Sequence, residues 1–528
     1  MKIRYVVLLL TLGLLVAPSA LRAQKKAVPP PANAPRQPAR TELLLDQYNS
    51  EVHVLPLPAD STVVVLVGRN QPLSSKTFYV FQQYDHALHL RQESQLEVPD
   101  EFNYVRMCAE AGTVYALFSS RTTPGRLWVA AYNGRLGQVR TQQYETRLSR
   151  EIVELKALDG RLFATVLLND QRHVTALLLD VATGQMQYLA SIYELLPTQL
   201  TFVADAVSRR AEYVLSQTNG RKSRLLLKQL TEHGQLVSSE FVQAESERSL
   251  ITAQLTPPQD TTARLLMGTY SLRDPNYAQG LFATDLRPTG TTGTKPPLRF
   301  YDFLRLKHFF DYLKPQRQAR LRQRTERRVA RSVPPLRWRY RLLLHELLPQ
   351  ADGGYVLVAE VYYPHYRYNS YNSMMTPFNN PSSLYGSGSS RVFDGYQTTH
   401  ALVCGFDRGG NLLWDNTFVV ENLRRRELEE AVRLQTLPDG RLVLAYLDEE
   451  KLRYKLIDRA ESSPNDHQVP IQTGLDPTRD TGPEHASDTW QSDLLPWFGS
   501  RFVASGYQRV RVGRGPDREV FFLNSVVF

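Results

Sequence analysis

The chain has 528 residues, a length that allows several domains or one large repeat array at roughly 100–200 residues per domain. Its formal net charge is +10, yet thirteen Lys or Arg residues fall between Arg305 and Arg341, where only Asp311 and Glu326 oppose them. The rest of the chain is therefore close to neutral, and the basic pI is a property of one segment rather than of the whole protein.

The first residues have the pattern of a targeting segment. A basic start precedes an apolar run over residues 5–16, and Ala23 ends a plausible cleavage site before Gln24. The run is shorter than the roughly 20 residues that a membrane helix needs, although an uncleaved anchor is the alternative. We predict a signal peptide over residues 1–23 and an exported protein, periplasmic, outer-envelope associated or secreted, with no transmembrane span after signal removal.

Residues 24–40 contain five prolines and few apolar side chains. Such a composition favours an extended tether over a packed core. We therefore expect the folded part of the chain to span residues 41–528.

Short strand-like runs recur along the chain every 40–50 residues, separated by turns such as Asp159-Gly160 and Asp439-Gly440. A period of this size is typical of a propeller or a solenoid, and the turn residues tolerate the positive φ that tight hairpins require. Eight repeats can be placed, at about residues 52–98, 103–146, 152–193, 200–244, 250–300, 338–420, 431–474 and 492–528.

The last repeat has only three strand-like runs, and an isolated run over residues 41–48 precedes the first repeat. Pairing of that isolated run with the last repeat would close a ring and remove exposed sheet edges. We predict an all-β fold, a single β-propeller with eight blades, or seven as the alternative, closed by an N-terminal strand and carrying one basic helical insertion.

The two cysteines, Cys108 and Cys404, lie in the second and sixth repeats. An oxidising compartment would permit a disulfide. Because these repeats are far apart around the ring, we expect two buried free thiols instead.

Over about seventy residues, the sixth repeat contains the motifs Asp352-Gly353-Gly354, Phe406-Asp407, Gly410-Asn411, Leu412-Leu413-Trp414 and Phe418. In these motifs it resembles a repeat found in bacterial extracytoplasmic β-propeller proteins. The resemblance implies a propeller fold and a location outside the cytoplasm. It implies no catalytic residues, because function lies in sites added to a fold.

A basic insertion interrupts the repeats at residues 301–336. Residues 301–313 have the apolar spacing of a helix that Pro315 would end or kink. The arginines that follow recur at spacings that place them on one side of a helix, where they suit phosphate or carboxylate groups. The alternative is a solvated helix. The candidate binding residues are Arg317, Arg320, Arg324, Arg327, Arg328 and Arg331.

A second candidate is the loop over residues 362–397, which is rich in Tyr, Asn and Ser. This composition is typical of adaptable recognition surfaces, although a self-packed or disordered insertion is the alternative. The candidate binding residues are Tyr363, Tyr366, Tyr368, Tyr371 and Tyr385.

We find no pattern for a metal, a cofactor or a catalytic group. The hairpin Asp407 to Asn411 lacks the spacing of a Ca²⁺ loop, the histidines are scattered over different repeats, and no nucleophile or phosphate-binding motif occurs. We therefore expect neither cofactors nor metal ions. Carboxylates brought together across a ring would escape this search.

The sequence favours a non-enzymatic binding or scaffold module at the cell envelope, with an unknown protein, a glycan or an anionic envelope surface as its partner. The alternative is a carbohydrate-active or other hydrolytic propeller enzyme whose channel is lined by carboxylates. Nucleic acid is disfavoured as a partner because the export signal places the protein outside the compartment that holds it.

Overall fold

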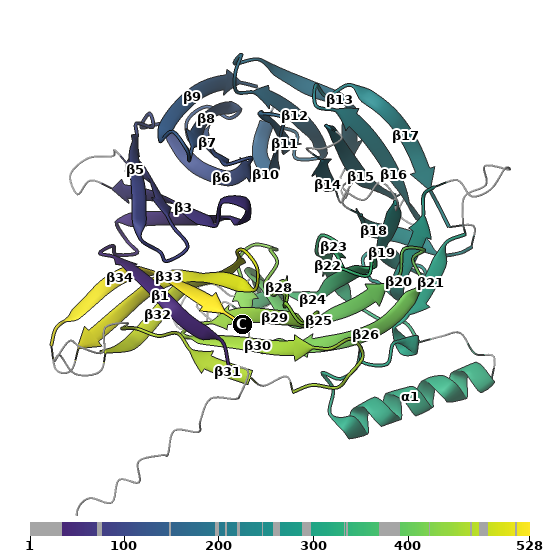
Figure 1. The fold of residues 1–528 in the computed structure, drawn as a ribbon. Helices are drawn as coiled ribbons and strands as arrows, with labels where there is room; N and C mark the ends of the chain where they lie inside the picture. The colour runs from purple at the N-terminus through teal and green to yellow at the C-terminus, as the bar shows by residue number, and fades with distance from the viewer. Residues whose placement is uncertain are drawn as a thin grey trace, which may run out of the picture. The chain divides into compact units, whose positions relative to one another are not determined.

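Among the residues that the structure describes, the strands pair into eight antiparallel sheets that follow one another around a common axis (Figure 1). This arrangement in the computed structural model is an eight-bladed β-propeller formed by residues 35–528. The described residues are 34–70, 77–146, 149–195, 200–205, 209–218, 222–244, 246–256, 264–287, 297–331, 333, 336–368, 391–421, 423–464, 467–474, 484–512 and 515–528.

The first four blades each have four consecutive strands. Blade 1 contains β2 (Ser50–Leu57), the short helix η1 (Pro58–Asp60), β3 (Thr62–Asn70), β4 (Thr77–Tyr84) and β5 (Leu90–Leu96). Blade 2 contains β6 (Phe102–Glu110), β7 (Thr113–Ser120), β8 (Arg126–Asn133) and β9 (Gln138–Glu145). Blade 3 contains β10 (Ser149–Leu158), β11 (Arg161–Leu168), β12 (His173–Asp180) and β13 (Met186–Leu195). Blade 4 contains β14 (Leu200–Asp205), β15 (Arg210–Thr218), β16 (Ser223–Thr231) and β17 (Leu236–Val242).

The other four blades carry the additions. Blade 5 contains β18 (Ser249–Leu255), β19 (Leu265–Ser271), β20 (Gly280–Asp285) and β21 (Arg299–Asp302). It is followed by the short helix η2 (Phe303–Arg305) and the helix α1 (Pro315–Ala330). Blade 6 contains β22 (Arg341–Leu344), β23 (Leu348–Pro349), β24 (Tyr355–Tyr368), β25 (Arg391–Phe406), β26 (Leu412–Val419) and β27 (Arg424–Arg425). Blade 7 contains β28 (Arg433–Thr436), β29 (Leu442–Asp448), β30 (Lys451–Ile457) and β31 (His467–Pro470). Blade 8 contains β32 (Glu484–Pro496), β33 (Arg501–Val512), β34 (Asp517–Val527) and β1 (Arg36–Leu43).

Burial follows the position of a strand within its blade. The second strand of blade 1 is buried from Thr62 to Gly68, and β19 is buried throughout, because both faces of these strands pack against neighbouring blades. The fourth strands β5 and β9 are largely exposed along one face, so exposed and less exposed residues alternate along them. The buried clusters accordingly join residues of adjacent blades, such as Phe81 of blade 1 and Tyr132 of blade 2, whose rings stack at 4.9 Å.

The ring closes through the N-terminal strand, as the sequence predicts. Strand β1 pairs antiparallel with β34, with Leu43 opposite Phe521, and completes blade 8. The closing strand begins at Arg36 and ends at Leu43, so it starts inside the segment expected to be a tether and stops short of residue 48. Arg40 explains the shift, because its guanidinium is held by the side chains of Gln508 and Asn524 at 2.9 and 3.0 Å.

The helical part of the insertion also differs from the prediction. Residues 301–313 do not form an α-helix: β21 ends at Asp302, the short η2 follows, and the aromatic side chains of Phe309 and Phe310 fill the space between blades 5 and 6. The helix predicted to carry the arginines is present as α1, which begins at Pro315. Proline is well suited to a first helical turn, where its missing N–H has no partner to lose.

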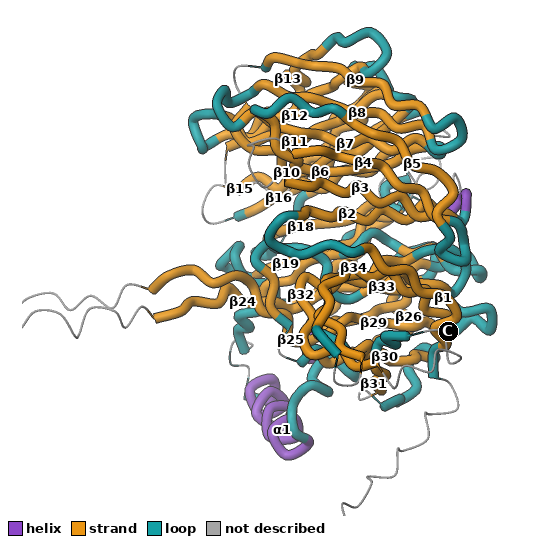
Figure 2. The backbone as a smooth tube through the Cα atoms, turned by 90° about the vertical axis from the view of Figure 1, so that its left-hand side faces the viewer, coloured by secondary structure: helices purple, strands orange, loops and turns teal. Residues whose placement is uncertain are grey.

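The loop expected over residues 362–397 is shorter than predicted. Strand β24 continues to Tyr368 and β25 begins at Arg391, so the two form a long hairpin that projects from blade 6 (Figure 2). Aromatic side chains favour a pleated strand, which explains why the ladder extends into this segment. Only residues 369–390 of the expected loop lie outside the described residues.

Both cysteines are free, as expected from their placement in different blades. Cys404 on β25 is fully buried, but Cys108 on β6 is only half-buried.

A truncated chain that begins at Asp46 lacks β1 and leaves the edge of β34 without a partner. We expect its melting temperature, followed by circular dichroism, to fall by more than about 5 °C, with aggregation on heating, because an unpaired edge recruits other strands. A chain that begins at Pro35 keeps β1 and should melt as the full-length chain does. Equal melting temperatures for the two truncations would contradict this role of β1.

Candidate functional site

The segments added to the four-strand pattern of the blades, namely the β24–β25 hairpin, α1 and residues 420–432, all emerge on one face of the propeller. In an antiparallel meander, the connection between the second and third strands of a blade emerges at the same end as the connection from its fourth strand to the next blade. The β24–β25 hairpin is a connection of the first kind, whereas α1 and the segment 420–432 are connections of the second kind. Figure 2 shows the hairpin and α1 leaving the same side of the propeller.

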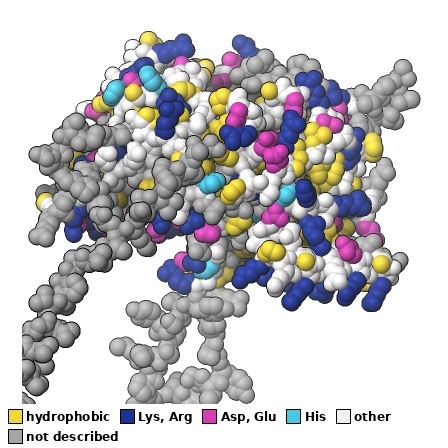
Figure 3. Space-filling model, turned by 60° about the horizontal axis from the view of Figure 1, so that its bottom comes forward, with side chains coloured by type: hydrophobic (Ala, Val, Ile, Leu, Met, Phe, Trp, Pro, Cys, Tyr) yellow, Lys and Arg dark blue, Asp and Glu magenta, His cyan; other side chains and the backbone are white. Residues whose placement is uncertain are grey.

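The predicted arginines form an exposed stripe on and just after α1. Arg317, Arg320, Arg324, Arg327 and Arg331 are exposed, and among the described residues no ion pair joins them to a carboxylate. Their spacing of three and four residues places them along one side of the helix. Figure 3 shows Lys and Arg side chains gathered in a row at the lower right of that view, where α1 lies. Arg328 is half-buried and does not belong to this exposed stripe.

The helix is fixed to the propeller from its other side. Leu321 packs against the cluster between blades 5 and 6, and Arg322 donates to the carbonyl oxygen of Lys307 at 2.7 Å. The segment before the helix is held by Asp415, which accepts from the backbone N–H groups of Lys307 and His308 at 2.9 and 2.6 Å. These contacts fix α1 to the propeller, so the exposed arginines project from a helix that is held in place.

Three of the predicted tyrosines, Tyr363, Tyr366 and Tyr368, belong to β24 of the projecting hairpin. Tyr366 contacts Phe393 on the opposite strand, and Phe393 in turn contacts Tyr396, so aromatic rings follow one another along the ribbon. Tyr366 and Phe393 are 47% and 46% exposed. Tyr363 is also exposed, at 37%. Partial burial of its side chain, together with the nearby Tyr312, raises the pKa of Tyr363 to about 12. The side chain of Tyr368 and the residues Tyr371 and Tyr385 lie outside the described part of the chain.

A third site, which the sequence does not reveal, lies at the propeller axis. A cavity of about 760 Å³ is lined by residues from the first strands of blades 2 to 7. At most junctions around the ring these first strands contact one another, so the cavity sits where the blades meet. Its charged lining residues are Arg106, Glu154, Lys156, Glu346, Glu429, Glu430 and Arg433.

Lys156 connects three blades across this cavity. Its ammonium group donates to Glu346 of blade 6 and, at 2.9 Å, to the backbone oxygen of Phe202 of blade 4. On the far side of the cavity, Arg433 of blade 7 pairs with Glu430 at 3.1 Å. Glu346 and Glu430 are thus each committed to a cation.

Glu154 is the exception. Its carboxylate comes no closer to Lys156 than 3.9 Å and, within the described residues, accepts no hydrogen bond. The side chain is 29% exposed, and that exposure is to the cavity. Burial raises the pKa of Glu154 to about 7, with Lys156 and Arg106 opposing the shift and Glu346 adding to it. A carboxyl group that titrates near neutral pH is typical of functional sites, although structural networks produce such shifts too.

The buried side chains of His345 and Glu360 form a pair that fixes the connection between blades 6 and 7 beside the cavity. Glu360 is 1% exposed and accepts from His345 Nε2 at 2.9 Å and from the backbone N–H groups of Ala431 and Val432 at 2.8 Å. Burial alone would lower the pKa of His345, but Glu430 and Glu360 outweigh it and the net pKa is raised. This pair therefore positions Glu430 and the start of blade 7.

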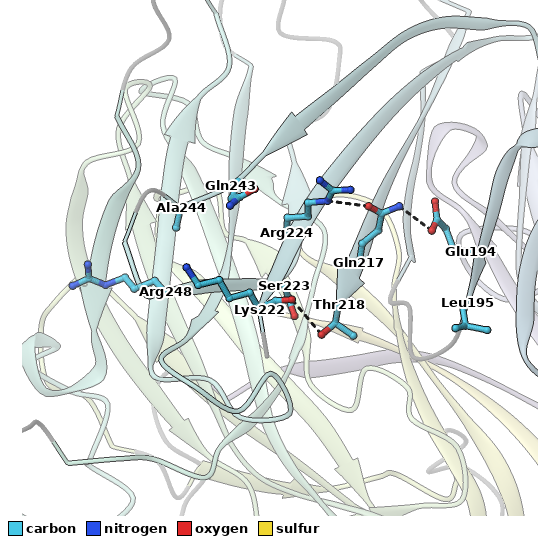
Figure 4. Close-up of a pocket in the computed structure, with 10 residues that line it drawn as sticks. All are labelled: Glu194, Leu195, Gln217, Thr218, Lys222, Ser223, Arg224, Gln243, Ala244 and Arg248. Atoms are coloured by element: carbon cyan, nitrogen blue, oxygen red, sulfur yellow. Dashed lines mark hydrogen bonds between the residues drawn. The ribbon is translucent and has the colours of Figure 1, made fainter. Parts of the chain in front are cut away.

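A second cavity, of about 530 Å³, opens on the same face between blades 3, 4 and 5 (Figure 4). Arg224 Nε donates to Gln217 at 3.1 Å, and Gln217 donates to Glu194 at 2.9 Å. Lys222 and Arg248 complete the charged lining, so cations outnumber carboxylates here. The segments 196–199 and 219–221, which adjoin lining residues in the sequence, lie outside the described residues.

Metal-binding groups are absent from the described part of the chain, where no three His, Cys, Asp or Glu side chains gather around one point. In the hairpin at Asp407, the carboxylate accepts from the N–H groups of Gly409 and Asn411 at 2.8 Å and so stabilises the turn. The described residues also include no helix of the length and apolarity needed to cross a membrane.

No family model matches the chain, and no curated protein matches it. Among solved structures, a polysaccharide lyase is 8% identical with a TM-score of 0.39, over 80% of this chain and 89% of the lyase. A prolyl endopeptidase is 11% identical with a TM-score of 0.38, over 89% of this chain and 54% of that enzyme. The acylaminoacyl peptidase of Pyrococcus horikoshii is 8% identical with a TM-score of 0.34, over 87% of this chain and 58% of the peptidase.

At these identities and TM-scores, the likenesses carry no argument about activity. The chain also spans little more than half of each of the two peptidases. The function of this protein must therefore be argued from its own residues.

The His345–Glu360 pair makes stability depend on pH. Because the folded-state pKa of His345 is raised, its contribution is complete below the ordinary value near 6.5 and is lost as the pH rises through the folded-state pKa. We expect His345→Gln to lower the free energy of unfolding by about 1–3 kcal/mol at pH 6. The deficit should shrink toward pH 9, as measured by urea denaturation at each pH.

The matched control is His86→Gln, at an exposed turn position, which should leave the free energy of unfolding unchanged at both pH values. A deficit for His345→Gln that stays constant or grows toward pH 9 would show that the charge of His345 adds no stability.

Proposed function

We propose that this protein is an exported, non-enzymatic binding module that docks onto an anionic surface of the cell envelope through α1. The observation that carries the proposal is the exposed stripe of five arginines, Arg317, Arg320, Arg324, Arg327 and Arg331, none of which is neutralised by a described carboxylate. A block of like charge attracts an oppositely charged partner.

The length and shape of the stripe favour a flat partner. Fourteen residues separate Arg317 from Arg331, which at about 1.5 Å per residue corresponds to roughly 21 Å along the helix axis. Guanidinium groups at such intervals suit the phosphate groups of a lipid surface, each of which accepts paired hydrogen bonds. An attraction of about 1 kcal/mol per basic residue near an anionic bilayer makes five arginines sufficient for docking.

The aromatic hairpin supports the same orientation. Tyr363, Tyr366 and Phe393 are exposed on the face of the propeller that carries α1. Tyrosine is enriched where proteins meet the membrane interface, because its ring is apolar and its hydroxyl group remains hydrated. Charge and aromatic side chains on one face would together set how the propeller sits on the surface.

A hydrolytic enzyme is the second candidate, and one observation favours it. Glu154 lies in the axial cavity with a pKa near 7, which suits a general acid or base at neutral pH. Of the other cavity glutamates, Glu346 and Glu430 are bound to cations, whereas Glu429 comes no closer to Arg425 than 3.9 Å. Glu429 is therefore the candidate for the second carboxylate that glycoside hydrolysis needs.

Replacing the five exposed arginines of α1 with Gln should weaken binding to vesicles that contain anionic phospholipid by on the order of 1000-fold, because about 5 kcal/mol of attraction is lost. Vesicle co-sedimentation at several salt concentrations measures this effect, and the wild-type affinity should fall as the ionic strength rises. Vesicles of zwitterionic lipid should not bind either protein.

The control variant carries five Arg→Gln changes at other exposed positions, namely Arg91, Arg135, Arg140, Arg408 and Arg459. It has the same net charge as the α1 variant and should bind anionic vesicles almost as the wild type does. An equal loss in both variants would reveal a general charge effect, and no loss in the α1 variant would rule out docking through this helix.

A further inference from the structure

The axial cavity contains polar groups that the fold leaves without partners. Gln254 of blade 5 is 8% exposed, its amide nitrogen donates to the Leu344 carbonyl at 3.3 Å, and its Oε1 finds no donor among the described residues. Glu154 accepts no hydrogen bond from them either. A buried acceptor left without a donor, such as Gln254 Oε1, costs free energy. Together with the cavity-facing carboxylate of Glu154, it points to a ligand that donates hydrogen bonds.

The guanidinium group of Arg106, which also lines this cavity, has no ion-pair partner among the described residues. Arg106 of blade 2 is half-buried, and its Nε donates to the backbone oxygen of Ile152 at 3.3 Å. Within the described residues it forms no ion pair, although it is close enough to Glu154 to act on the pKa of that carboxyl group. A guanidinium with free donors suits a carboxylate, which accepts two parallel hydrogen bonds.

Part of the cavity wall is apolar. Aliphatic and aromatic side chains from blades 3, 4 and 6 form this part, namely Leu167, Val174, Phe202, Leu342, Leu344 and Tyr362. The volume of about 760 Å³ lies within the range of cavities that hold small molecules, which are lined mostly by apolar groups with a few placed polar ones.

We propose that the axial cavity binds a small zwitterion with an apolar side chain, an amino acid or a dipeptide. Its ammonium group would donate to Glu154 and to Gln254 Oε1, its carboxylate would accept from Arg106, and its side chains would contact the leucine wall. This assignment gives Glu154, Gln254 Oε1 and Arg106 partners of the correct kind and leaves the cavity without added net charge. It does not depend on docking through α1.

Binding of such a ligand is coupled to the ionisation of Glu154. The charged and titratable groups that face Glu154 are Lys156 on its own strand, Arg106 of blade 2, Tyr213 of blade 4 and Glu346 of blade 6. Because burial raises the pKa of Glu154 to about 7, the carboxyl group is largely protonated at pH 6 and must lose its proton to accept an ammonium group. Affinity should therefore rise from pH 6 to pH 7.5, and should fall again above about pH 8 as the ligand amine loses its proton.

The test uses the full propeller and three matched probes in isothermal titration calorimetry. The probes are leucyl-leucine, its N-acetyl derivative, which lacks the cation, and its amide, which lacks the carboxylate. We expect leucyl-leucine to bind at least about tenfold more tightly than either derivative. At pH 6.5, titrations in buffers of different ionisation enthalpy should show release of a proton on binding.

Glu154→Gln should lower the affinity for leucyl-leucine about tenfold or more and abolish the proton release. Arg106→Gln should lower the affinity for leucyl-leucine but leave that for the amide unchanged, which separates loss of a contact from loss of the fold. Glu97→Gln, at an exposed position outside the cavity, should change nothing. The melting temperature of each variant reports whether the propeller is intact.

Absence of binding by leucyl-leucine at millimolar concentration would overturn the proposal. Equal affinity for all three probes would show apolar partitioning only. Binding that is unchanged in Glu154→Gln, with the fold intact, would show that the ligand site lies elsewhere.

Discussion

The antiparallel pairing of β1 with β34 is the constraint on which the rest of the propeller depends. It places Leu43 opposite Phe521 and converts an open array of sheets into a ring. The junction is reinforced from blade 8, where the indole N–H of Trp497 donates to the backbone oxygen of Thr62 in blade 1 at 2.9 Å. Only a closed ring keeps the first strands of all blades facing one axis, so the axial cavity exists because the two ends of the chain meet.

The two regions proposed to bind partners differ in physical character. The stripe on α1 is exposed, carries charge of one sign, and acts over the range of a Debye length. The axial cavity is a partly open hollow whose charges are nearly balanced, so its selectivity comes from the direction of single hydrogen bonds. The stripe lies on the face where the connections of blade 6 emerge, and one of these connections supplies Leu428, Glu429 and Glu430 to the lining of the axial cavity.

Much of the fold could be predicted from local patterns. Turns such as Asp439-Gly440, and the spacing between them, depend on residues that are neighbours in the sequence. The errors arose where tertiary contacts override local preference: residues 301–313 have helical spacing, yet Phe309 and Phe310 are drawn into the junction between blades. The axial cavity could not be foreseen. Arg106, Glu154 and Gln254 are separated by about fifty to one hundred residues each, and only the closed ring brings them to one place.

The composition of blade 8 also has a consequence for how the protein is made. Three of its strands lie between Glu484 and Val527 and the fourth begins at Arg36, so this sheet cannot form until the chain has been synthesised as far as β34. Earlier blades, built from neighbouring segments, can assemble while the chain is still emerging. Strands β1 and β34 lie almost five hundred residues apart in the sequence, so their pairing costs more loop-closure entropy than the pairing of neighbouring strands. We therefore expect the pairing of β1 with β34 to be the slow step of folding. Until that step, β34 and the hydrophobic flank of blade 1 remain uncovered, and this is the interval in which a chaperone would matter most.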